Sequence, residues 1–153
     1  MSFSTGYLAD PVKVGSGERF DPKADTVLSA STFENGLVVG RFAKLDAGSI
    51  DNIDSSASPV IAGVVLRKAS NPIEDASTID SSLFGQVEYL RAGLVTVDVV
   101  AADTPAQFGA VFVKNTNDAD AGKATTVDDA TTEAANAEFI QEVKANVWLV
   151  RLK

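Results

Sequence analysis

The residues of this chain that could carry out acid–base chemistry are its paired carboxylates. A glycosidase needs two carboxyl groups facing each other about 5–9.5 Å apart, with the pKa of one raised by burial. Each pair here lies in a stretch rich in small polar residues, where a solvated carboxyl keeps its ordinary pKa. The pairs therefore indicate an acidic, soluble surface rather than an active site. They are Asp51/Asp54, Glu74/Asp75, Asp118/Asp120 and Asp128/Asp129.

Residues 115–122 (NTNDADAG) have the composition of a calcium-binding loop. An EF-hand loop places its glycine sixth and a glutamate twelfth. With Gly122 in the sixth place, Asn117 would be first and Asp128 twelfth, so the register fails. We predict a hairpin tip and no metal site, because glycine and asparagine favour such turns. Weak calcium binding by the loop acids stays open as the alternative.

Cysteine and histidine are both absent from the chain. Their absence excludes thiol nucleophiles, disulfides, zinc sites built on these ligands and Ser-His-Asp triads. We therefore expect that the protein is not an enzyme and uses no cofactor. A chain without disulfides also fits synthesis in a reducing cytoplasm.

Length and charge exclude further classes. The chain has 153 residues, enough for one domain or one domain with an arm. Thirteen Lys and Arg against 21 Asp and Glu give a net charge of −8, which repels phosphate backbones and argues against nucleic acid as a partner. The longest uncharged apolar stretch, residues 60–66, is too short to cross a bilayer. The N-terminus lacks the basic region of a signal peptide, so we expect no membrane partner.

Strand patterns dominate from about residue 25. Residues 26–33 (TVLSASTF) alternate apolar and small polar side chains, and residues 37–43 (LVVGRFA) form an apolar run. Between them, Asn35-Gly36 is a strong hairpin signal because both residues tolerate a positive φ. We predict a hairpin here, with Gly40 at a bulge or a close backbone approach.

The pattern continues through the middle of the chain. Residues 46–59 hold turn formers and acids, so we predict a loop. Residues 60–67 are β-branched and predict a buried strand. Two further strands, residues 86–92 and 94–101, flank Gly93, and the second has the period of two that a half-buried antiparallel strand shows.

The last third adds two short strand signals, residues 110–114 and 123–127, and an apolar closing segment, residues 138–152. The candidate helix is residues 128–137 (DDATTEAANA), whose acids suit a helix N-terminus although it lacks an apolar stripe. About eight short antiparallel strands result. The predicted class is all-β, as a small β-barrel or β-sandwich.

Residues 1–24 differ from the β-rich domain of residues 25–153 and read as an extended N-terminal arm. They combine prolines and glycines with spaced apolar groups, which a wholly disordered tail rarely carries. Two interpretations stay open: the arm wraps its own domain, or it orders against a neighbouring subunit. Interface energy concentrates in buried aromatic groups. The predicted partner-binding anchors of the arm are Phe3, Tyr7, Leu8 and Phe20.

Short glycine-plus-valine signatures in a particular order suggest a family. They are Leu37-Val38-Val39-Gly40-Arg41-Phe42, Ala62-Gly63-Val64-Val65-Leu66, Gly93-Leu94-Val95-Thr96-Val97, Gly109-Ala110-Val111-Phe112-Val113 and Asn146-Val147-Trp148-Leu149-Val150-Arg151-Leu152, with Tyr89 before the third. Over residues 36–153 the chain resembles the structural cement, or decoration, proteins of tailed-bacteriophage capsids. It departs from their pattern in the polar stretch 115–137.

The resemblance implies a β-tulip-like domain on the outer surface of an icosahedral capsid. It implies binding to neighbouring major capsid proteins, which the domain bridges to stabilise the shell, and self-association as a homotrimer or a dimer. It also implies that the N-terminal arm reaches the capsid or a sister subunit. The acidic composition and the lack of catalytic residues agree with such a structural role.

Two other functions compete with this interpretation. The first is a carbohydrate- or receptor-binding module of the virion surface, for which Tyr89, Phe112 and Trp148 could form a ligand platform. Each of these aromatic residues lies inside a strand pattern, where core packing is the more common role. The second is a carboxylate-based hydrolase, which would need two acids on one buried face, and the sequence places none there.

Overall fold

The computed structural model describes residues 16, 17, 19, 26–31, 37–67, 78, 79 and 86–153. Within these residues every regular element is a strand, which confirms the all-β class. None of the described residues forms a helix that could cross a membrane. Several features singled out in the sequence lie outside the described residues: Phe3, Tyr7, Leu8, Phe20, the Asn35-Gly36 turn and the Glu74/Asp75 pair.

Eleven strands are described. They are β1 (Thr26–Ser31), β2 (Leu37–Val38), β3 (Phe42–Asp46), β4 (Ser49–Asn52), β5 (Val60–Val65), β6 (Thr78–Ile79), β7 (Gln86–Asp98), β8 (Ala110–Lys114), β9 (Ala124–Thr125), β10 (Thr132–Lys144) and β11 (Val147–Leu152). Nine form one sheet in the order β1-β4-β3-β5-β7-β11-β10-β8-β9, and β2 pairs with β6.

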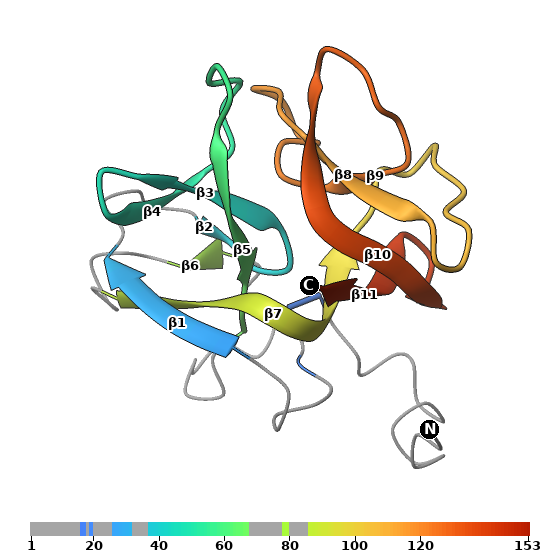
Figure 1. Ribbon diagram of the computed structural model, residues 1–153, viewed down its shortest axis with the longest axis horizontal. Coiled ribbons are helices and arrows are strands. Elements are labelled where there is room, and N and C mark those ends of the chain that lie inside the picture. The colour runs from blue at the N-terminus through green and yellow to red at the C-terminus, as the bar shows by residue number, and fades with distance from the viewer. Residues whose placement is uncertain (1–15, 18, 20–25, 32–36, 68–77, 80–85) are drawn as a thin grey trace.

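Strand β7 joins two lobes of this sheet (Figure 1). In the first lobe, β1 pairs with β7 along its length but meets β4 at a single residue pair, Ser31 and Ser49. This lobe therefore curls back on itself. The sheet of described strands does not close into a barrel, and of the two predicted architectures the sandwich-like one describes it better.

The 13 residues of β7 form one strand where the sequence predicts two. Its first half pairs with β1 and β5, and its second half pairs with β11 from Gly93 to Asp98. Gly93 has a φ of 125°, a conformation that glycine adopts without a steric cost. It marks the point where the strand passes from one lobe to the other, rather than a turn between two strands.

The core has two layers because β5 is buried on both faces from Ala62 onward. Val64 and Leu66 pack into the larger cluster between the lobes, with Phe139 from β10. Val65 packs into the smaller cluster inside the first lobe, with Ile50 from β4. Burial on both faces explains why the sequence of β5 is continuously apolar instead of alternating.

Two predictions for the first lobe are wrong. Strand β1 pairs with β7 and β4, and β2 pairs with β6, so residues 26–43 do not form the predicted hairpin. Residues 46–59 are not all loop, because a turn at Ala47 and Gly48 leads into β4. Both turn residues have positive φ, and Ile50 supplies the buried apolar side chain that anchors this polar strand.

The helix predicted over residues 128–137 is also wrong. Asp129 instead accepts hydrogen bonds from the backbone N–H and hydroxyl of Thr131, both at 2.7 Å, and β10 begins at Thr132. Acids that suit a helix N-terminus also cap turns in the same way. The segment lacks an apolar stripe, whereas Ala137 and Phe139, two residues apart, are both buried in the core.

Replacing Gly63 by alanine is expected to lower the free energy of unfolding by about 2 kcal/mol. A Cβ at this position would overlap the carbonyl oxygen of Leu90 in β7, and the φ of Gly63 is 153°. The matched control is Gly48→Ala, which has a φ of 87° but open space around the new methyl group. Urea unfolding measures both variants. Equal losses in the two would contradict the role assigned to the close approach of β5 and β7.

Candidate functional site

Three of the described loop acids have a lowered pKa, because hydrogen bonds within turns stabilise the carboxylate form. Lys44 Nζ lies 2.6 Å from the Asp54 carboxylate, and the Ser56 hydroxyl also donates to it. These hydrogen bonds, the one from Lys44 first, hold the pKa of Asp54 below its ordinary value of 3.8. Hydrogen bonds from Thr116 and Thr131 similarly lower the pKa of Asp118 and Asp129. A glycosidase acid needs the opposite shift.

The described residues contain no group of three or more acidic side chains placed to hold a metal ion. The Asp118 carboxylate accepts hydrogen bonds at 2.8 Å from the Thr116 hydroxyl and from the backbone N–H of Asp120. Residues 115–122 therefore form the hairpin tip that the sequence predicts.

Replacing Asp54 by asparagine is expected to lower the free energy of unfolding by up to about 1 kcal/mol at neutral pH, because the carboxylate is partly exposed. Since its pKa is lowered in the folded state, the stabilisation is present above the ordinary value of 3.8 and is lost as the pH falls through the folded value. The variant and the parent should converge in melting temperature in acid, once the pH has fallen below the folded pKa of Asp54. Asp46→Asn, an exposed acid on the neighbouring strand, is the control. A gap between variant and parent that persists in acid would contradict this account.

The three aromatic residues weighed as a ligand platform lie in different environments. Tyr89 is buried in the smaller core cluster. Trp148 packs edge-on against Phe139, with ring centroids 5.6 Å apart and an angle of 78° between the planes. Phe112 is half-buried on β8. The ring of Tyr89 thus serves packing, whereas Trp148, packed on Phe139, is half-buried and also lines a hollow of about 190 Å³ with Asp103 and Glu142.

Three described residues of the predicted arm contact the domain directly. The backbone N–H of Gly17 donates to the Thr96 carbonyl at 2.7 Å, and the Gly17 carbonyl accepts from the N–H of Arg67 at 3.2 Å. The Ser16 hydroxyl donates to Asp98, and Arg19 forms a β-bridge with Val95. Gly40 lies so close to Ser16 that a Cβ on it would overlap that residue, which confirms the predicted close backbone approach.

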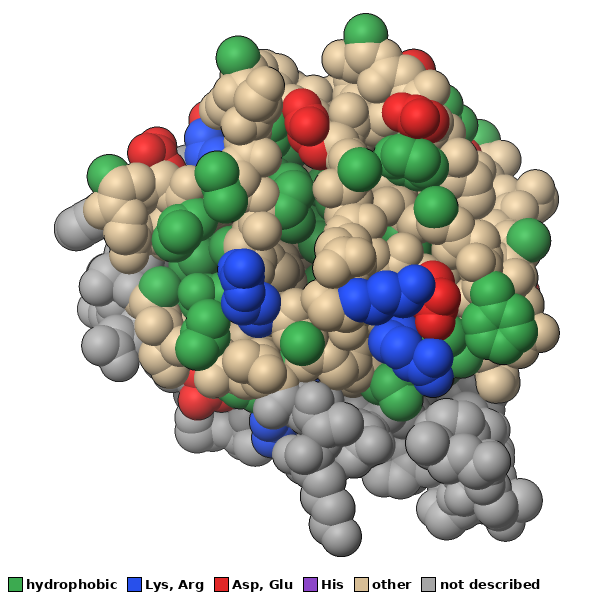
Figure 2. Space-filling model, in the orientation of Figure 1, with side chains coloured by type: hydrophobic (Ala, Val, Ile, Leu, Met, Phe, Trp, Pro, Cys, Tyr) green, Lys and Arg blue, Asp and Glu red, His purple; other side chains and the backbone are tan. Residues whose placement is uncertain are grey.

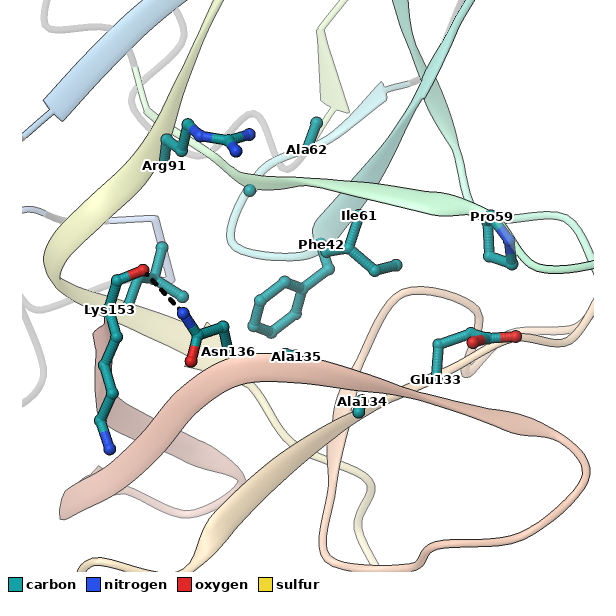
Figure 3. A pocket seen from close by; sticks show the side chains of 12 residues that line it. Phe42, Pro59, Ile61, Ala62, Arg91, Glu133, Ala134, Ala135, Asn136 and Lys153 are labelled. Carbon is teal, nitrogen blue, oxygen red and sulfur yellow. Dashed lines mark hydrogen bonds between the residues drawn. The ribbon is translucent and has the colours of Figure 1, made fainter.

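A groove of about 280 Å³ opens between β5 and β10, at the junction of the lobes (Figure 3). Phe42 and Ile61 point into its middle. Arg91 and Lys153 lie at one end and Glu133 at the other.

Phe108 is the most exposed large apolar residue described, at 63% of its surface. Its φ of 63° is a conformation that bulky residues rarely adopt. The turn is fixed on both sides, since the N–H of Phe108 donates to the Phe139 carbonyl at 2.6 Å and the N–H of Phe139 donates to the Gly109 carbonyl at 2.9 Å. A strained backbone that presents an aromatic ring to solvent is a common mark of a functional contact.

A second hollow, of about 520 Å³, lies between residues 55–58 and 115–117. Its described lining is polar and contains no aromatic ring on which a sugar could stack. The carbohydrate-binding alternative gains no support from this part of the chain.

Together, the fold and these surfaces define an all-β protein with surface features suited to protein contacts. The chain matches the XM1 gp53 minor capsid protein family over residues 11–153 and belongs to that family. The resemblance to tailed-phage capsid proteins is thereby confirmed, and the protein is a structural component located in the virion capsid.

Two further comparisons were informative. A chain in a solved structure, the capsid of Myoviridae Phage XM1, is 37% identical to this one, with a TM-score of 0.84. That match covers 92% of this chain and 90% of the other. No curated protein matches the chain.

The sequence does not predict the exposed Phe108 or the groove between β5 and β10. Phe108 was visible only as part of a turn-rich segment before Gly109. Arg91 and Glu133 are 42 positions apart in the printed sequence, and only the tertiary fold places them on one groove. The predicted arm anchors lie outside the described residues and stay a prediction.

Proposed function

We propose that this protein binds the outside of an icosahedral phage shell and bridges neighbouring major capsid proteins, so that the shell resists disruption. The match over residues 11–153 to a minor capsid protein family carries this proposal. The protein acts by binding and not by catalysis, in agreement with the lowered pKa of the loop acids. A homotrimer is the proposed assembly, with a dimer as the alternative.

The arm and Phe108 are the proposed contacts. Phe3, Tyr7, Leu8 and Phe20 supply apolar groups in a segment that can pair with a foreign sheet edge. Many copies on a lattice then hold well even if each contact is weak, because further contacts on the same assembly become intramolecular. Phe108 adds a rigid aromatic ring at an exposed turn.

Shells assembled without this protein test the proposal. Adding the purified chain should raise the temperature at which the shells release their DNA to a dye. Sedimentation should show bound protein at a fixed ratio to the major capsid protein. Shells that bind none of it, or bind it without a gain in thermal resistance, would contradict binding or stabilisation respectively.

Replacing Phe108 by alanine should weaken shell binding roughly tenfold, the loss expected of a buried aromatic contact. Folding should be unaffected, because the ring is exposed and the turn is held by backbone hydrogen bonds. Co-sedimentation with shells over a concentration series measures the affinity. Val127→Ala, another exposed apolar residue at 42%, is the control. Unchanged binding of the Phe108 variant would remove this residue from the interface.

A further inference from the structure

The groove between β5 and β10 is bordered by two strand segments that lack a partner on the groove side among the described residues. Strand β5 pairs with β3 from Val60 onward, but β7 meets its other edge only at Val64 and Val65. Strand β11 ends opposite Ala137 of β10. Beyond that pair, the N–H of Lys153 donates to the Asn136 carbonyl at 2.9 Å. The edges of residues 61–62 and 133–135 line the groove and have no β partner on that side among the described residues.

An open edge inside a groove is suited to receiving an extended chain. Main-chain groups supply the hydrogen bonds of an added strand, and the groove selects its side chains. Here Phe42, only 2% exposed, lines the groove with Ile61 beside it. A groove of about 280 Å³ takes a short extended segment and not a folded domain.

Positive charge gathers at one end of the groove although the chain carries a net charge of −8. Arg91 and Lys153 line this end, but the side chain of Lys153 runs away from the groove (Figure 3). Arg151 and Lys153 share one carboxylate, that of Glu138, each at 3.1 Å, so the cluster keeps an excess of positive charge. Arg91 forms no ion pair with any described residue. Figure 2 shows basic side chains on this face, below a hollow with apolar side chains, with one of them set apart from the others.

We propose that this groove binds an extended, acidic segment of a neighbouring shell protein, which adds as a β-strand between β5 and β10. A carboxylate of the segment meets Arg91, and an apolar side chain covers Phe42 and Ile61. A second copy of this chain docking across a two-fold axis would place the basic cluster against itself, which disfavours that occupant. The inference rests on the proposed function, because the partner is another protein of the shell.

A thiol footprint tests which face is covered. The chain contains no cysteine, so Ala134→Cys in the groove lining and Ala145→Cys in the β10–β11 turn each create a single, exposed thiol. On binding to shells, the Ala134→Cys variant should lose most of its reactivity toward a maleimide, while Ala145→Cys keeps its own. Equal reactivity of both thiols on shells that do bind the protein would overturn the groove assignment and leave the proposed function intact.

The free protein distinguishes the occupants. If the Ala134→Cys thiol becomes protected in the absence of shells as protein concentration rises, the occupant is a second copy, and the proposed partner is wrong. Failure of both variants and of the parent to bind shells would instead count against the proposed function.

Charge reversal tests the recognition itself. Arg91→Glu should weaken shell binding roughly tenfold at low salt, with a smaller effect at high salt as the charges are screened. Lys144→Glu makes the same change at an exposed position at the far end of β10 and should bind like the parent. Equal effects of the two reversals would show that only net charge matters and would overturn the proposed docking.

Discussion

Replacing Phe139 by alanine is expected to lower the free energy of unfolding by about 3–5 kcal/mol. Its side chain is fully buried at 0% exposure in the core cluster between the lobes. It also packs edge-on against Trp148 at 5.6 Å, and such pairs add about 0.5–1.5 kcal/mol beyond area burial. Domains are commonly stable by about 5–15 kcal/mol, so this one change would remove a large share of the total.

Phe108→Ala is the matched control, because it removes the same ring from a position that is 63% exposed. Urea unfolding should show a clear fall in midpoint for Phe139→Ala and almost none for Phe108→Ala. Under conditions in which both variants are folded, Phe108→Ala should lose shell binding and Phe139→Ala should keep it. Similar stability losses at both positions would mean that the interface between the lobes is not the main source of stability.

The sequence predicted elements wherever burial was visible along a continuous stretch. Strand β5 was recognised because both its faces are buried, so every side chain is apolar. Strand β4 was missed because Ile50 is its one fully buried apolar residue, surrounded by the serine and acids of a loop-like stretch. Local composition carries little information where one side chain anchors a strand.

The helix error has the same origin. Residues 128–137 have acids placed for a helix N-terminus, but Phe139 and Ala137 need alternate side chains to face the core. Tertiary packing stabilises the alternating strand pattern of these buried residues, and this outweighs the weak helical signal of the acids.

The candidate surfaces could not be predicted for a different reason. The groove joins residues of β3, β5, β7 and β10, so no window of the sequence contains it. The exposure of Phe108 depends on the turn that binds Phe139, which is distant in sequence. Family membership could be anticipated because several short glycine-containing strands occur in a recognisable order, and the match over residues 11–153 confirms it.

Removing residues 1–15 is expected to weaken shell binding roughly a hundredfold and to leave the domain folded. A second linked contact raises avidity by a factor of this order, so losing it should lower binding by a similar factor. The deletion takes away Phe3, Tyr7 and Leu8, the first three proposed anchors. It spares Gly17, whose backbone bonds to Thr96 and Arg67 belong to the domain. A longer deletion of residues 1–24 would also remove these bonds and the Arg19–Val95 bridge, so it should lower the melting temperature as well.

Comparing the two deletions separates tethering from folding. The melting temperature measures the stability of the domain, and co-sedimentation with shells measures binding through the arm. The shorter deletion should therefore lower shell binding and leave the melting temperature unchanged. Full-length Tyr7→Ala and Phe20→Ala then locate the anchors, with Lys13→Ala as a control within the same segment. If the protein lacking residues 1–15 protects shells from heat as well as the parent does, adhesion resides in the domain. The groove and Phe108 would then have to supply it alone.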